Sequence, residues 1–336
     1  MHLKFALIGC GRIAERHAEQ MRKWGQIAAV CDIIPERMEA YARQDGSNTY
    51  TSTDQLFAHE LNLDLVVICS PNYLHAVHSI TALNHGFHVL CEKPLSISSA
   101  DAKNMIQAAD ENKKSLFVVK QNRYNPPVKA LKNLITSGKI GKINSFQINC
   151  FWNRPNAYYK DSWRGNREMD GGILYTQFSH FIDLLIWMLG DVKSTHALTA
   201  NYLHPHIEIE DAGIICFEMQ SGAMGAMHFH VNAYRQNMEG SFTIFAEKGT
   251  IKIGGQYLNT LEYQMLEGKP IHTEPSTATA NDYGFYQGSM SNHDLVYADV
   301  VKTLHGEDRG VADGHEGLKS VEIIEEIYRS ANRIQS

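Results

Sequence analysis

"LIGCGRIAERHA", residues 7–18, decides the fold of the first part of this chain. It joins the apolar, strand-like run Leu3–Ile8 to a helix-period segment through Gly9-x-Gly11-x-x-Ala14. In such a turn the first glycine permits the tight bend, and the second lets the backbone approach a pyrophosphate. The N–H groups at the start of the helix then hold the phosphates. With a strand before it and a helix after it, this otherwise weak pattern predicts a dinucleotide site.

Asp32 strengthens this interpretation, because it stands at the end of the next predicted strand, 23 residues after Gly9. We expect its carboxylate to bind both ribose hydroxyls of the adenosine and to repel a 2′-phosphate, which favours NAD over NADP. Arg37 on the following helix could soften that preference. Arg12 and Ile13, at the start of the first helix, complete the expected cofactor site. The alternative is a glycine turn and a helix-capping Asp in a sheet that binds nothing.

Short apolar runs alternate with amphipathic segments through the first 120 residues. Such alternation predicts βαβ units and a parallel sheet covered on both faces. Pro35, Asn72 and Ser98 stand where helices should begin, and Asp101 is the acidic capping partner of Ser98. The predicted strands are Leu3–Ile8, Ile27–Cys31, Leu65–Cys69, His88–Cys91 and Ser115–Val119.

The pattern changes after Asn125-Pro126-Pro127 to period-2 segments separated by glycines, which predicts a large, mostly antiparallel sheet. We therefore expect an α/β protein with a nucleotide-binding domain at 1–122 and an α+β domain for substrate binding and oligomerisation at 123–336. The predicted strands are 142–152, 193–203, 209–219, 223–231, 240–246 and 249–254; the predicted helices are 128–137, 172–188, 293–305 and 316–334; and 267–290 is predicted to be a long loop.

Composition excludes several classes of function. A formal net charge of −6, without a run of basic residues, gives no general attraction to nucleic acid or anionic lipid. The most apolar segment, Ile182–Leu189, is too short to span a bilayer, and a strand-like run beginning at Leu3 leaves no room for a signal peptide. Six cysteines occur singly. We interpret them as packing thiols in a reducing cytoplasm rather than as disulfides or metal ligands.

Polar residues also follow the predicted strand Leu65–Cys69. Ser70, Asn72 and His75 emerge at its carboxyl end, where open α/β sheets bind ligands, so we expect them to contact the cofactor. Two alternatives remain: Asn72 could be an ordinary helix N-cap, and His75 could be a surface helix residue.

The corner Glu92-Lys93-Pro94 follows the buried strand His88–Cys91. Burying a charge is costly unless it is paired or used. Beside a cationic nicotinamide the pKa of Lys93 should fall, which makes it a candidate to take a proton from a substrate hydroxyl. The alternative is a Glu–Lys pair at a turn that the proline merely ends.

A second candidate for proton transfer is His180. It lies on a predicted helix, and it shares one face of that helix with Ile173, Gln177, Leu184 and Met188, which recur every three or four residues. A lone His on such a face is more often a core residue, but Thr176 and Gln177 stand one turn before it. Asp183, one turn later, could orient His180 or cap nearby backbone.

These motifs together resemble the Gfo/Idh/MocA oxidoreductases over essentially the whole chain. The resemblance rests on the glycine turn, Ser70-Pro71-Asn72, Glu92-Lys93-Pro94, Trp163-Arg164, and Gly171-Gly172 followed by His180. It implies a Rossmann domain, a carboxyl-terminal domain whose open sheet face builds homodimers or homotetramers, and sugar or cyclitol substrates. "QNRYNPPVKALKNLITSGKIG", "WNRPNAYYKDSWRG" and "GSMSNHDLVYADVV" are most similar to the UDP-N-acetylglucosaminuronate 3-dehydrogenases of bacterial surface-polysaccharide synthesis, whose product a PLP aminotransferase uses.

The resemblance also implies roles for single residues. Lys93 matches the family's lysine and His180 its acid/base histidine, whereas Thr176 stands where the family commonly has Asp or Asn. A hydroxyl can bind a sugar but cannot hold a charge. The cofactor contacts that we expect beyond the glycine turn are Glu92, Lys93, Gln121, Trp163 and Arg164.

Further substrate contacts are inferred from residue type. Arg123, Arg154 and Arg164 could pair with a carboxylate or diphosphate. Aromatic side chains could cover a sugar or uracil. A possible anion site lies at a helix start. The aromatic candidates are Tyr124, Tyr158, Tyr159 and Trp163; the helix-start candidates are Ser289, Ser291, Asn292 and His293; and Thr176 and Gln177 are expected near the sugar.

His204-x-His206 and His228-x-His230 are spacings also found in metal sites. The second pair shares one face of a predicted strand, but no acidic or Cys partner lies close to it in sequence, so we expect no metal. The favoured function is oxidation, at C3, of a UDP-linked amino-sugar uronate by NAD. The alternatives are a dehydrogenase of a free sugar or inositol, an NAD-dependent glycosidase without net redox change, and a non-catalytic sensor of NAD and sugar.

Overall fold

The computed structural model describes residues 2–274, 278–307 and 310–334. They form two compact units, Met1–Val119 with His293–Val321, and Lys120–Asn292 with Glu322–Ser336. The units therefore differ from the expected division at residue 122, because His293–Val321 joins the first unit. The physical reason is packing: the Tyr297 hydroxyl lies 2.9 Å from Nδ1 of His17, and the Val118 N–H donates to the Ala312 carbonyl at 2.9 Å.

The first unit contains a six-stranded sheet in the order β3-β2-β1-β4-β5-β6. Every neighbouring pair is parallel, which confirms the predicted Rossmann topology. The short edge strand β3, which is largely exposed, is the one strand of this sheet that was not predicted. The strands are β1 Leu3–Ile8, β2 Gly25–Cys31, β3 Asn48–Tyr50, β4 Leu65–Ile68, β5 His88–Cys91 and β6 Leu116–Val118.

Helices connect these strands, and one of the three predicted starts, Ser98, is the cap of an α-helix. The Ser98 side chain accepts a hydrogen bond from the Asp101 N–H at 3.3 Å and so caps α5. Pro35 and Asn72 begin short 3₁₀ turns, Pro35–Arg37 and Asn72–Leu74. The helices are α1 Ala14–Trp24, α2 Glu39–Asp45, α3 Thr53–His59, α4 His75–Asn84, α5 Ser99–Glu111 and α10 His293–Leu304, and α11 Gly314–Ser330 begins in this unit.

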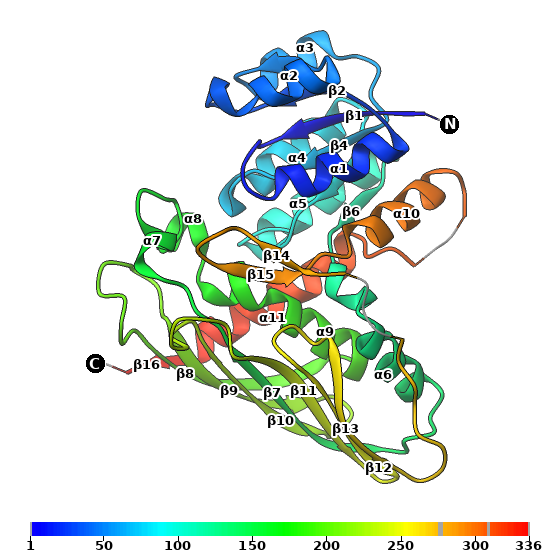
Figure 1. The fold of residues 1–336 in the computed structure, drawn as a ribbon, viewed down its shortest axis with the longest axis vertical. Coiled ribbons are helices and arrows are strands. Elements are labelled where there is room, and N and C mark those ends of the chain that lie inside the picture. The colour runs from blue at the N-terminus through cyan, green and yellow to red at the C-terminus, as the bar shows by residue number, and fades with distance from the viewer. Residues whose placement is uncertain (1, 275–277, 308–309, 335–336) are drawn as a thin grey trace. The chain divides into compact units, whose positions relative to one another are not determined.

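The second unit contains an eight-stranded sheet in the order β13-β12-β11-β7-β10-β9-β8-β16. It is mostly antiparallel, as predicted; β10 pairs with β7, and β16 with β8, in parallel. Its helices lie along one side of the sheet (Figure 1). The strands are β7 Ile143–Phe151, β8 Val192–Ala200, β9 Ala212–Met219, β10 Met224–His230, β11 Glu239–Ala246, β12 Gly249–Gly254, β13 Thr260–Leu266 and β16 Ala331–Arg333.

Three features of the second unit correct the sequence analysis. The last helix does not reach residue 334, because Ala331–Arg333 leaves it to pair with β8. The segment 267–290 is not wholly a loop: Ala280–Asp282 (β14) and Gln287–Met290 (β15) form a hairpin, while residues 275–277 lie outside the described residues. The strand β13 had not been predicted. The helices here are α6 Pro126–Thr136, α7 Asn156–Tyr159, α8 Arg167–Asp170 and α9 Ser179–Leu189, with a 3₁₀ turn at Gln121–Tyr124.

The predicted helix 172–188 is a π-helical segment, Leu174–Phe178, followed by α9. Together with α8 it forms the stretch Arg167–Leu189, which is long and apolar enough to cross a membrane by length and composition. That stretch is longer than the apolar segment that the sequence analysis measured. Its most apolar window is 78% buried inside the protein, as expected of a core helix, so it is weak evidence for a membrane span.

Side chains on the sheet of the second unit alternate between buried and exposed, most regularly along β9. The exposed face of the sheet carries large apolar side chains on several neighbouring strands. Exposed apolar residues on it include Leu198, Ile214, Met224, Phe245, Tyr263 and Met265. Cys216 is exposed on the same strand β9, which corrects the expectation that all six cysteines are packing thiols, whereas the other five are buried.

Candidate active site

The glycine turn between β1 and α1 is closed at one glycine and open at the other. Gly9 has φ +91°, and a Cβ there would lie 2.6 Å from backbone atoms of Cys69 and Ser70. Glycine is therefore required by conformation and by the close approach of the chain after β4. A Cβ at Gly11 would meet nothing within 4 Å. The turn thus leaves open space beside Gly11, at the start of α1, as a bound pyrophosphate needs.

Asp32 at the end of β2 is held by the same turn. Its Oδ2 accepts a hydrogen bond from the Cys10 N–H at 2.8 Å, and its Oδ1 accepts one from the Ile34 N–H at 2.9 Å. Arg37, half exposed, lies 3.6 Å from Oδ1. The carboxylate is thus fixed beside the turn, and Arg37 is near enough to offset part of its negative electrostatic potential. Arg12 is exposed and Ile13 half-buried at the start of α1.

The segment after β4 corrects both alternatives for its polar residues. Asn72 is not an N-cap, because it is the first residue of the 3₁₀ turn, whose cap is Pro71. His75 is not a surface residue, because it is 1% exposed. Its Nδ1 lies 2.6 Å from the Pro94 carbonyl and its Nε2 2.9 Å from the Ser70 carbonyl. With both ring nitrogens engaged by backbone, His75 can shape the site, but cofactor contact through its ring is disfavoured.

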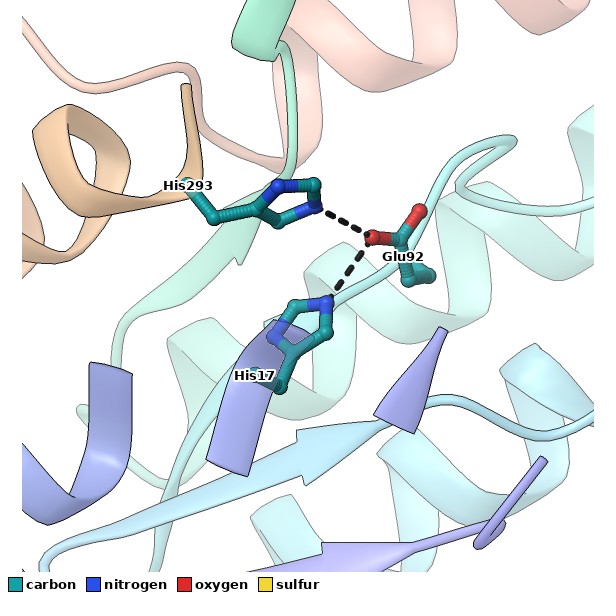
Figure 2. Close-up of side chains that lie close together, drawn as sticks. All are labelled: His17, Glu92 and His293. Carbon is teal, nitrogen blue, oxygen red and sulfur yellow. Dashed lines mark hydrogen bonds and ion pairs between the residues drawn. The ribbon is translucent and has the colours of Figure 1, made fainter. Parts of the chain in front are cut away.

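The corner after β5 is held from several sides. The buried carboxylate of Glu92 lies 2.9 Å from Nε2 of His17 and 3.4 Å from Nε2 of His293 (Figure 2). It also accepts a hydrogen bond from the Lys93 N–H at 3.0 Å. The simple Glu–Lys turn pair is thus an incomplete account, because Glu92 has partners on α1 and α10. Lys93 is half-buried at this corner.

In the second unit, His180 lies at the start of α9 and is 3% exposed. Its Nε2 is 3.5 Å from the side-chain nitrogen of Gln121, a long contact in which the amide donates and the imidazole accepts. The Thr176 hydroxyl donates to the buried carboxylate of Asp170, which also accepts a hydrogen bond from the Gly165 N–H at 2.8 Å. The Thr176 side chain cannot hold a charge itself, but it is hydrogen-bonded to an acidic group, the carboxylate of Asp170.

Asp183 neither orients His180 nor caps backbone, which corrects both expectations for it. Its carboxylate pairs with the Lys120 ammonium at 3.1 Å and accepts two hydrogen bonds from Arg123, at 2.8 and 2.9 Å. Burial acts to raise the pKa of Asp183, but the two cations outweigh it and lower the pKa to about 2. Since Arg123 is bound to Asp183 in this way, the expected substrate contact of Arg123 is disfavoured.

Arg154 and Arg164 differ from Arg123. Their guanidinium carbons lie 5.5 and 4.9 Å from the ring centroid of Tyr158. Arg164 also lies over Trp163, and Arg154 over Tyr286. Within the part of the chain that the structure describes, neither guanidinium has a carboxylate at ion-pair distance. Arg154 is 2% exposed, and burial lowers its pKa, since a cation there loses its hydration.

Unsatisfied polar atoms lie among these arginines. The Tyr159 hydroxyl and Nε of Arg164 are buried without a hydrogen-bond partner among the described residues. Gln177 accepts from Nε of Arg154 at 2.7 Å and donates to the Tyr158 hydroxyl at 2.6 Å. We call Arg154, Tyr158, Tyr159, Trp163 and Arg164 the guanidinium cage. A buried cage with two cations and unused donors fits an anionic ligand.

Four other residues expected to contact the substrate take part in contacts within the chain. The amide nitrogen of Asn292 donates to the Gln121 carbonyl at 3.1 Å and to Oδ1 of Asn125 at 2.7 Å. The Ser289 hydroxyl donates to Asn122, and the Ser291 N–H donates to the Thr279 carbonyl at 2.9 Å. The expected anion site at this helix start is therefore disfavoured. Tyr124 instead packs under the Lys129 ammonium.

Among the described residues, the paired histidines form no cluster with metal-ligand spacing. His204 lies 3.1 Å from Asp211 and 2.9 Å from the Arg154 carbonyl. His228 and His230 both pack on Phe151. The cluster with such spacing is His17, Glu92 and His293, which sequence reasoning missed. The available signal was a histidine in the buried stripe of α1, between Ala14 and Ala18.

The comparisons with known proteins agree on one family. Residues 3–120 match the model "Oxidoreductase family, NAD-binding Rossmann fold", and residues 128–252 match the "GFO/IDH/MocA C-terminal domain". The D-apiose dehydrogenase of Rhizobium rhizogenes is 32% identical over 98% of this chain and 95% of that protein. The chain belongs to the Gfo/Idh/MocA family.

Two solved structures are more similar still. The WlbA dehydrogenase of Bordetella pertussis, in complex with NADH and UDP-GlcNAcA, is 35% identical with a TM-score of 0.88, covering 98% of this chain and 96% of that one. The WlbA dehydrogenase of Chromobacterium violaceum, with the same ligands, is 37% identical with a TM-score of 0.88, covering 98% and 93%. With the open turn at Gly11 and the fixed Asp32, these findings make the Gfo/Idh/MocA protein described here an NAD-dependent sugar oxidoreductase.

Proposed function

We propose that this enzyme oxidises the C3 hydroxyl of UDP-linked N-acetylglucosaminuronate. The observation that carries the proposal is the guanidinium cage, in which Arg154 and Arg164 lack carboxylate partners among the described residues. A uronate carboxylate or a diphosphate would neutralise these cations, and the tyrosine and tryptophan rings offer surface to a sugar or uracil. The similarity to the WlbA dehydrogenases supports this choice, because their structures contain UDP-GlcNAcA.

Oxidation of an alcohol removes a hydride from carbon and a proton from oxygen. The glycine turn, Asp32, Ser70 and Asn72 would hold NAD, which would supply the hydride acceptor. We assign the proton to Lys93 and His180, both polar side chains at the ends of buried elements. Through its hydroxyl, Thr176 binds the sugar and links it to Asp170. Glu92, Gln121, Trp163 and Arg164 remain proposed cofactor contacts.

Lys93→Ala tests this assignment most directly. We expect turnover to fall by about 10²- to 10⁴-fold, the range that a positioned acid or base contributes. Binding of NAD should stay within a few-fold, because the glycine turn and Asp32 are unchanged. Steady-state rates and a fluorescence titration with NADH measure the two effects. Wild-type rates in the variant would remove Lys93 from the mechanism.

The substrate is tested by a single-turnover fluorescence assay for bound NADH. NAD-loaded enzyme is mixed separately with UDP-N-acetylglucosaminuronate, UDP-N-acetylglucosamine and myo-inositol. Signal with the uronate alone supports the proposal and its anion site. Signal with inositol alone would replace it with a free-sugar or inositol dehydrogenase, a class that the whole-chain similarity to D-apiose dehydrogenase favours. If none of the three compounds gives NADH fluorescence, glycosides are tested next, with release of the aglycone as the readout.

We further propose that the apolar sheet face of the second unit is the surface through which homodimers or homotetramers form, since it spans neighbouring strands. Sedimentation velocity of the wild type and of Met224→Glu distinguishes these states from a monomer. We place the reaction in the cytoplasm, in surface-polysaccharide synthesis, where an aminotransferase would consume the 3-keto product.

A further inference from the structure

Four buried side chains of the first unit form one hydrogen-bonded chain. The Tyr297 hydroxyl lies 2.9 Å from Nδ1 of His17, whose Nε2 lies 2.9 Å from Oε1 of Glu92. Nε2 of His293 lies 3.4 Å from the same oxygen (Figure 2). His17, His293 and Tyr297 are each no more than 1% exposed, and Glu92 is 6% exposed. The residues come from α1, α10 and the end of β5.

The surroundings decide which atoms carry the protons. Burial lowers the pKa of His17, so its ring is neutral, and burial raises the pKa of Tyr297, so its phenol keeps its proton. A neutral imidazole offers one donor and one acceptor. The consistent arrangement has the Tyr297 O–H donating to Nδ1 of His17, and the His17 Nε2–H donating to Glu92. His293 then donates from Nε2, and its Nδ1 has no partner among the described residues.

This arrangement keeps Glu92 charged. Burial acts to raise the pKa of its carboxyl group, but the hydrogen bonds from His17 and His293 outweigh burial and hold the pKa well below its usual range. Both donors meet one carboxylate oxygen. The other oxygen, Oε2, accepts from the backbone N–H of Lys93 at 3.0 Å. The orientation of the carboxylate is therefore tied to the backbone at Lys93.

The far side of the corner is held as well. Nδ1 of His75 on α4 lies 2.6 Å from the Pro94 carbonyl. Histidines from three helices thus brace the two residues that flank Lys93. A long, flexible lysine can be aimed reproducibly only if its own backbone is fixed.

We propose that His17 and His293 are positioning residues: they hold Glu92 as an oriented carboxylate and thereby fix the backbone from which Lys93 acts. This inference rests on the proposed function only in giving Lys93 its role in proton transfer.

The three ligand atoms of His17, Glu92 and His293 lie within 4.8 Å of one another, a spacing that a divalent metal could also use. The hydrogen-bonded arrangement explains the geometry better, because each Nε2 faces the carboxylate as a donor should. Nδ1 of His17 also has its own donor in Tyr297. A metal would require both Nε2 atoms to be deprotonated.

The first experiment is independent of any sugar. In ¹⁵N-histidine-labelled enzyme, assigned with His17→Gln and His293→Gln, both Nε2 atoms should remain protonated from about pH 6 to 9, because each Nε2–H donates to the carboxylate of Glu92. Metal analysis of the same sample should give no stoichiometric zinc. Deprotonated Nε2 atoms together with one zinc per chain, lost in either variant, would overturn the proposal in favour of a metal site.

The second experiment measures catalysis. His17→Leu and His293→Leu should each lower kcat by about 30- to 100-fold, as a misplacement near 1 Å does, while the KM for the sugar and the affinity for NAD change little. His17→Gln and His293→Gln retain an N–H toward Glu92 and should recover most of the rate. The matched control is His88→Leu, at the first residue of β5, the strand that Glu92 follows; the His88 ring accepts a hydrogen bond from the Ser115 N–H instead of contacting Glu92.

The outcomes separate the two proposals. If no UDP-sugar reacts, the proposed substrate fails, whereas the NMR experiment still decides the hydrogen-bonded arrangement, and the kinetics are repeated with whichever sugar reduces NAD. Equal rates for the Leu and Gln variants would overturn the positioning role. So would a loss of NAD binding that matches the loss of rate, because that result indicates collapse of the cofactor site.

Discussion

Arg123 and Arg164 lie in the same unit and are both partly shielded from water, yet they differ in whether a carboxylate of the chain neutralises the guanidinium. Arg123 shares the carboxylate of Asp183 with Lys120. Arg164 lies over aromatic rings, and its Nε has no partner within the described part of the chain. A cation that the chain neutralises itself contributes to structure. A cation that it leaves between aromatic rings retains its capacity to bind an anion.

The first unit shows the same contrast in its two glycines. At Gly9 the chain itself fills the space that a side chain would need, whereas beside Gly11 that space is open. In both units, therefore, two kinds of position can be distinguished. At one kind the chain's own atoms fill the space or pair the charge, and at the other they leave room or a hydrogen-bond donor for a ligand. Substitutions at matched positions test this separation.

The largest effect is expected for Asp183→Asn. Removing this carboxylate leaves Lys120 and Arg123 without their buried partner, which should lower the free energy of unfolding by about 3–5 kcal/mol. Urea unfolding measures the loss, and Asp110→Asn, at an exposed position on α5, is the control. A stability equal to that of the wild type would show that the ion pairs contribute nothing.

The same variant has a predicted pH dependence. The folded-state pKa of Asp183, about 2, is depressed below the unfolded value of 3.8. Its contribution to stability is therefore fully present above about pH 4 and is lost as the pH falls toward 2. The stability difference between wild type and Asp183→Asn should shrink over that range. A constant difference would mean that Asp183 does not titrate as assigned.

The glycine pair should show the next largest effect. Gly9→Ala combines a positive φ with contacts of 2.6 Å to backbone atoms, so we expect a loss of roughly 2–4 kcal/mol of stability. Gly11→Ala should leave the melting temperature unchanged but weaken NADH binding by at least about tenfold, since its methyl group enters the space for the phosphates. Thermal unfolding without cofactor and an NADH titration separate the two. Similar melting temperatures would contradict the contrast.

Arg164→Met should raise the KM for an anionic sugar by about 10- to 100-fold, because a charge-assisted hydrogen bond is worth about 1.5–3 kcal/mol. The melting temperature should not fall, as no carboxylate among the described residues loses a partner. Arg123→Met should behave in the opposite way, with a lower melting temperature. If both variants lose stability equally, the distinction between the two arginines is wrong.

The smallest effect is expected for Asp32→Ala. We predict about tenfold weaker binding of NAD and reduced discrimination against NADP, with Arg37 left free to meet a 2′-phosphate. Titrations with both dinucleotides measure this preference. An unchanged ratio of affinities would show that Asp32 does not face the ribose.

Local patterns predicted most of the secondary structure. The strand β5 was predicted at its observed bounds, and the cap at Ser98 was correct, because side-chain period and capping depend on residues close in sequence. The prediction failed where a distant partner decides. Ala331–Arg333 continues a helical pattern but becomes a strand because β8 offers a free edge. Residues 280–290 carry little alternation and form a hairpin with each other.

By itself, the sequence determined the nucleotide-binding fold, the identity of its turn and the corner at Lys93, since each depends on a contiguous motif. Only the tertiary structure decided which charges are already paired. Glu92 meets His17 and His293, which lie 75 and 201 residues away in the chain, and Arg123 meets Asp183 across 60 residues. Charge pairing depends on distance in space, and no spacing along a chain encodes it. For the same reason, the structure alone distinguishes an arginine that stabilises the fold from one that remains available to a substrate.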